Sequence, residues 1–337
     1  MLENKEIHIS EDEAALYDRQ IRLWGLDAQK RLRGSRILVI GMRGLGAEIC
    51  KNVVLAGVKS VTLMDHTNVE KDDETSQFLV QRTDEGKNRA ECSLDRTQQL
   101  NPMVHVYKDT ESVAAKPDEF FHNFEVVCAT CCTTQEMIRI NNVCHSRGIK
   151  FFAGDVFGYY GYMFADLNDH EYLEEVHHVV STGYGAKKQK IPDSKMAKRN
   201  SRFITLQDVL DFDWASTKGK MLMNKTPETY FISLVLLRFR SEQVLHNAQL
   251  TKEEKQKKVL GLKNTVMEEI GISDSIVSDK FVSYCMGELS PVCAILGGVL
   301  SQEIIKAVSA KDMPHNNFFF FDGVDGKGLV DCIGTYE

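Results

Sequence analysis

The chain has 337 residues, of which 43% are hydrophobic and 26% are charged, and its formal net charge is -7 at pH 7. A chain of this length can bury a large core and usually forms one to three domains. The acidic balance argues against direct binding of nucleic acid, and the lack of an 18-residue apolar run predicts no membrane span. Because Met1–Glu6 is polar and does not resemble a secretion signal, we expect a soluble intracellular protein.

The cysteines predict neither a disulfide framework nor a metal centre. There are nine of them, mostly within apolar runs, which is typical of reduced thiols packed as small core residues. Cys128 and Cys131 form a CxxC pair, but a structural zinc ion needs further ligands at suitable spacing, and the sequence offers none. We therefore predict no metal site.

The first predicted element is a helix over residues 11–24. Ser10 and Glu13 have the spacing of a capping box, which marks a helix start. Within the helix, Arg19 and Arg22 lie close to two aromatic residues. Taken alone, this pattern fits a solvated helix face.

Residues 36–65 predict a strand, a glycine-rich turn, a helix and a second strand that ends at Asp65. The turn contains Gly41, Gly44 and Gly46, and an acid about 20 residues further on is the usual ribose ligand of a dinucleotide-binding unit. Arg43 stands where such a turn normally has a glycine that lets the backbone approach phosphate. The sequence therefore predicts a nucleotide pocket that is retained but altered.

The rest of the chain continues the alternation and then interrupts it. Up to residue 167 the pattern predicts further strands and helices, which together favour an α/β fold with a doubly wound, Rossmann-like sheet. Residues 168–280 read as an insertion, with a mobile, lysine-rich loop at 168–202 and a small α-rich subdomain after it. Residues 281–337 then return to the first domain through an apolar helix and a final strand pair.

Several of these segments occur together in the order found in the ubiquitin-like-activating enzymes, which have the ThiF/MoeB-like adenylating fold. They are Tyr17–Ile21, Gly41–Gly46, Asp65, Gln77–Phe78, and Pro291–Ala294 with Gly297–Gly298. The chain resembles this family over nearly its whole length. Gly154–Tyr159 and Pro314–Phe319 resemble in particular the smaller subunits of its heterodimeric, SUMO-activating members.

The resemblance implies a chemistry that this chain has largely lost. The family joins the C-terminal glycine of a modifier to AMP, using ATP and Mg²⁺, and then transfers the acyl group to a cysteine. The residues at five catalytic positions of an active site differ here; they are Arg43, Thr67, Ser76, Arg89 and Cys132. Without the carboxylate that holds Mg²⁺, the phosphate charge has no metal to neutralise it. We therefore expect Gly41, Gly44, Gly46 and Asp65 to form a vestigial pocket that binds no cofactor productively.

The resemblance also implies a partner. In this fold two adenylation-like domains pair face to face, and the arginine of an Arg-Gln pair reaches the ATP phosphates of the opposite domain. Here that arginine is Arg19. The expected partner is a larger, catalytic subunit that holds ATP and Mg²⁺, with SUMO as its substrate. No cysteine lies between Cys144 and Cys285, where the family places its catalytic-cysteine region, so the thioester is expected on the partner.

Three other interpretations remain open from the sequence. They are a self-sufficient homodimeric adenylating enzyme, an NAD-dependent oxidoreductase built on the same unit, and a pure scaffold. The first two need a competent pocket, and the third differs from the heterodimer hypothesis in the role of Arg19. Lysine clusters at residues 187–199 suggest a nuclear location, with the cytoplasm as a second compartment.

Overall fold

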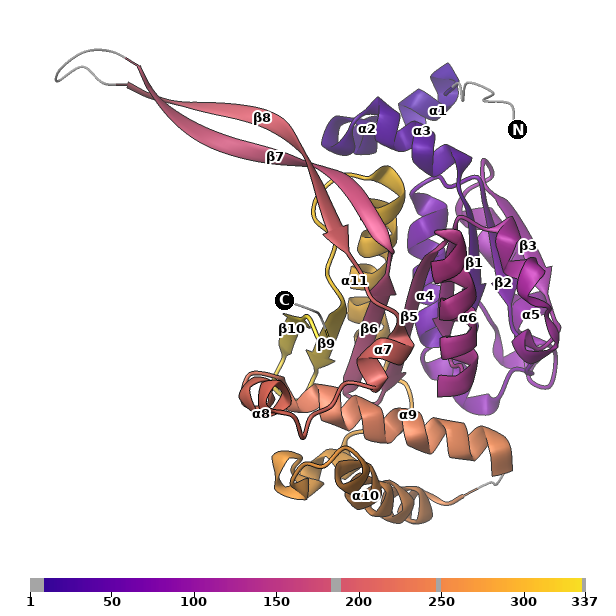
Figure 1. Cartoon of the computed structure of the whole chain (residues 1–337). Helices are drawn as coiled ribbons and strands as arrows, with labels where there is room; N and C mark the ends of the chain where they lie inside the picture. The colour runs from indigo at the N-terminus through magenta and orange to yellow at the C-terminus, as the bar shows by residue number, and fades with distance from the viewer. Residues whose placement is uncertain (1–8, 183–188, 247–249, 335–337) are drawn as a thin grey trace.

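The computed structural model describes residues 9–182, 189–246 and 250–334, and its centre is an eight-stranded sheet (Figure 1). The strand order is β10-β9-β6-β5-β4-β1-β2-β3. The strands are β1 (Arg36–Ile40), β2 (Ser60–Met64), β3 (His105–Asp109), β4 (Val126–Thr130), β5 (Lys150–Phe157), β6 (Tyr160–Asp166), β9 (Phe318–Asp322) and β10 (Lys327–Asp331). β3, β2, β1, β4 and β5 run parallel, whereas β6, β9 and β10 are antiparallel additions.

Helices cover both faces of the sheet because alternate strand residues point to opposite sides. Ile37 and Val39 pack into a core with α3, α4 and α11, while Leu38 and Ile40 pack into a second core with α6 and α9. The helices outside the insertion are α1 (Glu11–Leu16), α2 (Asp18–Trp24), α3 (Leu26–Gly34), α4 (Gly44–Leu55), α5 (Arg89–Leu100), α6 (Thr134–Arg147) and α11 (Ser290–Ser309). The predicted doubly wound α/β fold is confirmed.

The strand order places a switch point between β1 and β4, which is where open α/β sheets bind ligands at their carboxyl edge. The glycine-rich turn follows β1 at this edge. The N-terminal helices α1 to α3 lie at the opposite, amino edge, at the top of Figure 1. Gln20 fixes this arrangement, since its Nε2 donates to the Leu55 carbonyl at the far end of α4, 3.1 Å away.

The predicted N-terminal helix forms, but it breaks at Tyr17 into α1 and α2. The capping box is present, with Ser10 Oγ accepting from the Glu13 amide and the Glu13 carboxylate accepting from the Ser10 amide. Tyr17 turns inward, where its ring packs against Gly57 and its hydroxyl accepts from Asn101 Nδ2 at 2.8 Å. Gly57 is needed here because its φ is +80° and an added Cβ would lie 2.4 Å from Tyr17 Cζ.

The expectation of a loop at residues 168–202 is wrong for most of the segment. β7 (Asp169–Thr182) and β8 (Gln189–Arg202) pair antiparallel along their whole length and project from the body as a ribbon (Figure 1). The sequence hid this because charged residues recur along both strands and interrupt the apolar alternation that identifies strands. Part of the cluster Lys187–Lys190 lies outside the described residues. All of Met1–Glu6 also lies outside them.

The segment that was expected to form an α-rich subdomain consists mainly of helices and packs at the carboxyl edge of the sheet. Its helices are α7 (Leu206–Leu210), α8 (Thr217–Met223), α9 (Glu228–His246) and α10 (Lys252–Glu269). α9 carries the aromatic residues Tyr230 and Phe231 into the core, where Tyr230 contacts Phe318 and Phe320 of β9. The insertion is therefore part of the same packed body.

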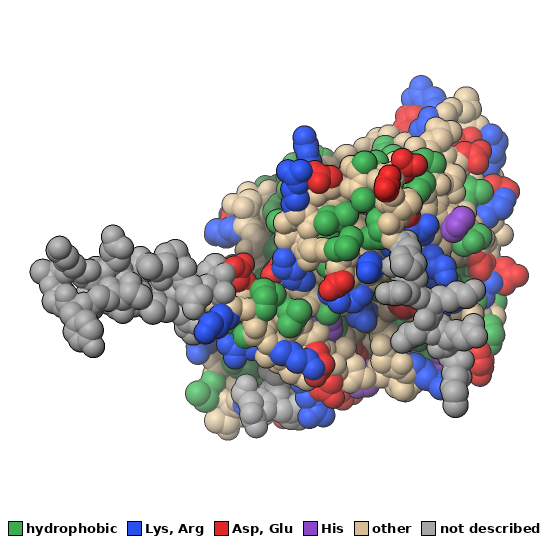
Figure 2. All heavy atoms as spheres, turned by 90° about the horizontal axis from the view of Figure 1, so that it is seen from above, with side chains coloured by type: hydrophobic (Ala, Val, Ile, Leu, Met, Phe, Trp, Pro, Cys, Tyr) green, Lys and Arg blue, Asp and Glu red, His purple; other side chains and the backbone are tan. Residues whose placement is uncertain are grey.

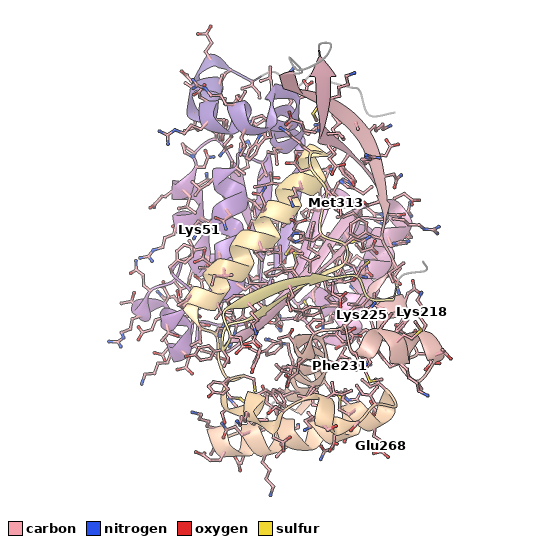
Figure 3. The ribbon with its side chains drawn as sticks, turned by 90° about the vertical axis from the view of Figure 1, so that its left-hand side faces the viewer. Lys51, Lys218, Lys225, Phe231, Glu268 and Met313 are labelled. Carbon is pink, nitrogen blue, oxygen red and sulfur yellow. The ribbon has the colours of Figure 1, made fainter. Side chains whose placement is uncertain are left out.

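α11 crosses α4 on one face of the sheet (Figure 3). Gly297 allows this crossing, since a Cβ there would lie 2.5 Å from Glu48 Cβ, whereas an added Cβ at Gly298 would meet nothing within 4 Å. Among the described helices, α11 has the length and hydropathy of a membrane span, but 67% of that window is buried in the body. Its position is that of a core helix.

We expect Gly57→Ala to lower the free energy of unfolding by weakening the contact between Tyr17, which precedes α2, and the body of the protein. A left-handed backbone costs a non-glycine residue about 1–2 kcal/mol, and the clash with Tyr17 adds to this. Urea unfolding of the full chain measures the loss. Gly86→Ala is the matched control, because Gly86 also has a positive φ, +83°, but nothing within 4 Å of an added Cβ. Equal losses in the two variants would contradict a contribution from the Tyr17 contact.

Candidate functional site

The glycine-rich turn has the backbone geometry of a nucleotide-binding unit. Gly41 has a φ of +84°, and an added Cβ would lie 2.4 Å from the Thr130 carbonyl oxygen on β4. Gly46 packs the first turn of α4 on β1, since a Cβ there would lie 1.9 Å from the Gly41 carbonyl oxygen. Gly41 therefore serves the tight turn, and Gly46 serves the contact between helix and strand.

The N-terminus of α4, which would hold phosphate in such a unit, already binds a carboxylate of this chain. The Gly44 amide donates to Glu288 Oε2 at 2.8 Å. A helix N-terminus favours an anion because its first amides are unpaired and the helix dipole is positive there. Glu288 comes from the segment before α11, far along the chain. It therefore takes the place that a phosphate oxygen would need.

Asp65, the predicted ribose ligand, is also fully engaged. Its Oδ2 accepts from the Met42 amide at 2.8 Å and from Arg89 Nη1 at 3.0 Å, while its Oδ1 accepts from the amide and hydroxyl of Thr67. Burial alone would raise the pKa of Asp65, but Arg89 and these hydrogen bonds hold the pKa below its usual value. The carboxylate is ionised and has little capacity left for a ribose hydroxyl.

Arg89 is the centre of this network. Its side chain is 1% exposed and pairs with two buried carboxylates, Asp65 and Asp73, with Nη2 of Arg89 at 2.7 Å from Asp73 Oδ2. It also donates to Thr67 Oγ1 and to the Asn68 carbonyl. A buried guanidinium is stable only when its donors are paired in this way. Arg89, one of the five positions at which the chain differs from an active site, is therefore fully paired within this chain.

Arg43 points into the same region but not toward a free anion site. Its Nη2 lies 2.7 Å from Glu70 Oε2, and its Nε lies 3.9 Å from Asp73 Oδ1. Gln77 links the segment after β2 to the glycine-rich turn and to α5. Its Nε2 donates to the Met42 carbonyl at 2.8 Å and to Ser93 Oγ at 3.0 Å. The loop after β2 is thus folded onto the glycine-rich turn.

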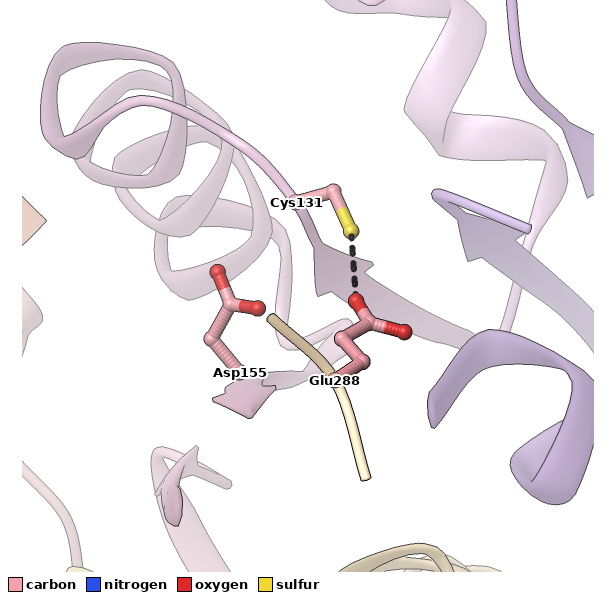
Figure 4. A group of neighbouring side chains, drawn as sticks. All are labelled: Cys131, Asp155 and Glu288. Atoms are coloured by element: carbon pink, nitrogen blue, oxygen red, sulfur yellow. Dashed lines mark hydrogen bonds between the residues drawn. The ribbon is translucent and has the colours of Figure 1, made fainter. Parts of the chain in front are cut away.

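A second cluster, Cys131, Asp155 and Glu288, could by distance hold a metal ion, since one ligand atom from each lies within 4.8 Å of the others (Figure 4). Two arginines already balance its charge. Arg240 of α9 lies 2.7 Å from Asp155 Oδ2, and Arg43 lies on the other side, near Glu288. Burial raises the pKa of Asp155 to about 7 against the opposing effect of Arg240. A dication would have to displace these cations, so the donor set does not fit a metal.

The cysteines offer no activated thiolate. Burial raises the pKa of eight of the nine thiols, to about 12 for Cys131, Cys144 and Cys285. A nucleophilic cysteine needs the opposite shift. Cys332 is exposed but follows the edge strand β10, which β9, β6 and β5 separate from β4 and the pocket. Cys132 is 3% exposed and packs after β4, as expected.

Arg19 is placed differently from the other predicted site residues. Tyr17 and Gln20 anchor their side of α2, and Arg19 is exposed and makes no hydrogen bond or ion pair with the residues that the structure describes. Arg22, one turn further on, is instead paired with Asp18 at 3.0 Å. The length of α4, about 18 Å for its 12 residues, separates the Gln20 anchor from Gly44. Arg19 therefore lies far from the pocket of its own chain.

The structure thus brings the three glycines and Asp65 together and leaves Arg19 at the opposite edge. Sequence reasoning missed the side chains that fill the pocket; they are Asp73, Asp155, Arg240 and Glu288. Asp155 lies in a segment already noted for its resemblance, but Arg240 and Glu288 reach the pocket from distant parts of the chain. No local pattern marks such long-range contacts.

Comparisons with known proteins agree with this geometry. The ThiF family model matches residues 17–332. SUMO-activating enzyme subunit 1 of Xenopus tropicalis is 49% identical over 99% of this chain and 100% of that protein, and the human subunit 1 is 48% identical over 97% of this chain and 96% of that protein. The solved structure of SeMet PaaA shares the fold at 16% identity, with a TM-score of 0.59 over 99% of this chain and 78% of that chain. The resemblance to the ubiquitin-like-activating enzymes is confirmed.

We expect Arg89→Met to be strongly destabilising, because it leaves Asp65 and Asp73 buried without their cation. Breaking a buried pair in this way typically costs about 3–5 kcal/mol. Arg82→Met is the control: Arg82 is 79% exposed and pairs with Glu74, and such surface pairs contribute about 0–1 kcal/mol. Chemical denaturation compares the two variants. A loss for Arg89→Met no larger than the control's would show that the network does not hold the pocket.

Proposed function

The chain belongs to the ThiF family, and we propose that it is the non-catalytic subunit of a heterodimeric SUMO-activating enzyme. The observation that carries this proposal is the state of its own pocket. The Glu288 carboxylate binds the N-terminus of α4, where phosphate would bind. Arg89 donates to the carboxylate of Asp65, the predicted ribose ligand. Such a pocket has no free groups for ATP, so the adenylation chemistry belongs to the larger subunit, which holds ATP and Mg²⁺.

In this enzyme the heterodimer uses ATP to adenylate the C-terminus of SUMO and then forms a thioester on a cysteine of the larger subunit. The contribution of this chain is Arg19, which completes the partner's ATP site in trans. An exposed guanidinium such as that of Arg19 can donate two parallel hydrogen bonds to phosphate oxygens. It stabilises the negative charge that spreads over the α-phosphate and the leaving pyrophosphate during attack.

The other interpretations are less compatible with the contacts of the pocket. A homodimeric adenylating enzyme and an NAD-dependent oxidoreductase both need the Asp65 carboxylate and the α4 terminus free for ligand, and both are engaged. A pure scaffold explains the filled pocket but gives no role to Arg19, which is exposed and has no ion-pair partner among the described residues. The nuclear location suggested by the lysine clusters remains a proposal that microscopy of the tagged protein would test.

We expect the purified chain to show no ATP–pyrophosphate exchange with SUMO and Mg²⁺, because its ribose and phosphate positions are filled by its own side chains. The assembled heterodimer, measured in parallel, should exchange. Robust exchange by the chain alone would overturn the assignment of a non-catalytic subunit.

We expect Arg19→Ala to lower the exchange rate of the heterodimer without preventing its assembly. Removing one preorganised donor of this type costs roughly 10²–10³ in rate. Arg19→Lys should restore activity only in part, since an ammonium lacks the planar fork of a guanidinium.

Arg22→Ala is the internal control for this experiment, because Arg22 lies on the same helix but is paired with Asp18. Size-exclusion chromatography checks that each variant assembles. Wild-type exchange from an intact Arg19→Ala heterodimer would remove the trans role and leave the scaffold interpretation.

A further inference from the structure

Three successive carbonyls at the C-terminal end of α4 accept hydrogen bonds from side-chain amides of other segments. The last carbonyls of a helix have no partner within the helix, so they are satisfied from outside it. Here the amide nitrogens lie 2.9, 3.1 and 3.0 Å from the carbonyl oxygens, and the pairs are Asn101 with Val54, Gln20 with Leu55, and Gln29 with Ala56. We call Gln20, Gln29 and Asn101 the amide cap of α4.

The amide cap is also bonded to α2 along its whole length. The hydroxyl of Tyr17, which precedes α2, accepts from Asn101 Nδ2 at 2.8 Å. Gln20 belongs to the middle of α2 itself. Trp24, the last residue of α2, donates from Nε1 to Gln29 Oε1 at 3.0 Å. The start, the middle and the end of α2 are thus each linked to the same end of α4.

Attachment at three points fixes both the position and the direction of α2. A helix of seven residues is too short to be stable on its own in water, so it depends on its contacts with the body. A single hydrogen bond would let such a helix swing about that bond, whereas three bonds along its length prevent this. Arg19 lies between the first two attachment points, so its backbone is held although its side chain is exposed.

The cap residues themselves lie inside the protein. Gln29 is 0% exposed and Asn101 is 4% exposed. The outer side of this end of the molecule instead carries hydrophobic side chains mixed with charged ones of both signs, as Figure 2 shows from above. Gln29 and Asn101 therefore cannot touch a ligand of another molecule, and any effect they have on such a ligand passes through the helix that they hold.

We propose that Gln29 and Asn101 are positioning residues for adenylation, which fix the direction in which α2 presents Arg19 to the nucleotide of the larger subunit. This inference rests on the proposed function, since it takes Arg19 as a donor to the nucleotide phosphates. A donor stabilises developing charge most when it needs no reorientation during the reaction. A displacement of about 1 Å at a reacting group can cost roughly 10² in rate, even when the substitution lies far from the chemistry.

The residue types of the amide cap suit a link between two elements better than a simple helix cap. A side-chain amide both donates and accepts, so one residue can bond to two elements at once. Gln29 uses its nitrogen for α4 and its oxygen for Trp24. Asn101 uses its nitrogen for α4 and Tyr17, while its oxygen accepts from the Met103 amide at 3.0 Å. A lysine would also satisfy helix carbonyls, but it has no acceptor for the indole of Trp24.

The test is ATP–pyrophosphate exchange by the heterodimer, with assembly checked by size-exclusion chromatography. Gln29→Met keeps the length of the side chain and removes both of its hydrogen bonds, and Asn101→Ala releases the start of α2. Each should lower the maximal rate at least about tenfold, but by no more than Arg19→Ala does, because the cap acts only through Arg19. The Michaelis constant for ATP should change by a smaller factor, since the interaction is made in the transition state.

Asn141→Ala is the matched control for Asn101→Ala. Asn141 is 0% exposed, its Nδ2 donates to Asp166 Oδ2 at 2.8 Å, and its Oδ1 accepts from the Leu206 amide at 2.6 Å. It belongs to α6, which packs on the face of the sheet opposite to α4. Both substitutions should lower the thermal midpoint of the free chain, but only Asn101→Ala should slow exchange by the assembled heterodimer. An equal fall in exchange for the control would overturn the proposal.

Two further measurements keep the test independent of a general loss of stability. In the Arg19→Ala background, Gln29→Met should cause no further loss of exchange, because the group that it positions is gone. A loss of the same factor in both backgrounds would overturn the proposal. Trp24→Phe is the milder variant, since Trp24 is half-buried and only the bond at the end of α2 is removed. It should also slow exchange, by a smaller factor than Gln29→Met.

These outcomes separate the amide cap from the trans arginine. Slow exchange by Arg19→Ala together with wild-type exchange by Gln29→Met and Asn101→Ala would refute the positioning role and leave the proposed function intact. Wild-type exchange by Arg19→Ala would refute the trans arginine itself, and the cap would then have no donor to position. Hydrogen exchange of the free chain tests the cap without the partner: the amides of α2 should exchange faster in Gln29→Met than in the wild type, and unchanged rates would overturn the proposal.

Discussion

The structure depends most on the pairing of Arg89 with Asp65 and Asp73 beneath the carboxyl edge of the sheet. Three ionised side chains in a nearly dry environment are stable only as a set, because each compensates the desolvation of the others. The pairing holds the loop after β2 against the glycine-rich turn. Both carboxylate oxygens of Asp65, the predicted ribose ligand, already accept hydrogen bonds within the chain. The charge network thus holds the loop after β2 and engages the carboxylate of Asp65.

The second constraint is the length of α4. Its N-terminus belongs to the pocket, and its C-terminal residue, Leu55, receives the hydrogen bond from Gln20 that holds α2. A helix is a rigid spacer, so the filled pocket and Arg19 are held at opposite edges of the sheet. Any function of Arg19 on a nucleotide must therefore involve another molecule. This geometric separation makes the role proposed for Arg19 independent of the altered pocket of its own chain.

The sequence predicted the parts of the fold that follow from local patterns. The run Ile37–Ile40, the glycines after it and the capping box at Ser10 each have a local physical cause, and each forms as predicted. The ribbon at residues 168–202 was missed because charged residues recur along both strands and hide the apolar alternation that identifies strands, although His170 and Tyr172 at the base of β7 are buried. Glu288 and Arg240 were missed because their roles arise from contacts across more than 80 residues, which no spacing rule encodes.

The residues of the altered pocket connect segments that are far apart in the sequence. Glu288 precedes α11, where the chain returns from the insertion, and its bond to the Gly44 amide ties that return to the glycine-rich turn. Arg240, from the insertion itself, is paired with Asp155 on β5. The helix terminus that would attract a phosphate attracts a carboxylate for the same electrostatic reason. The backbone geometry of the fingerprint therefore joins three distant segments of one chain.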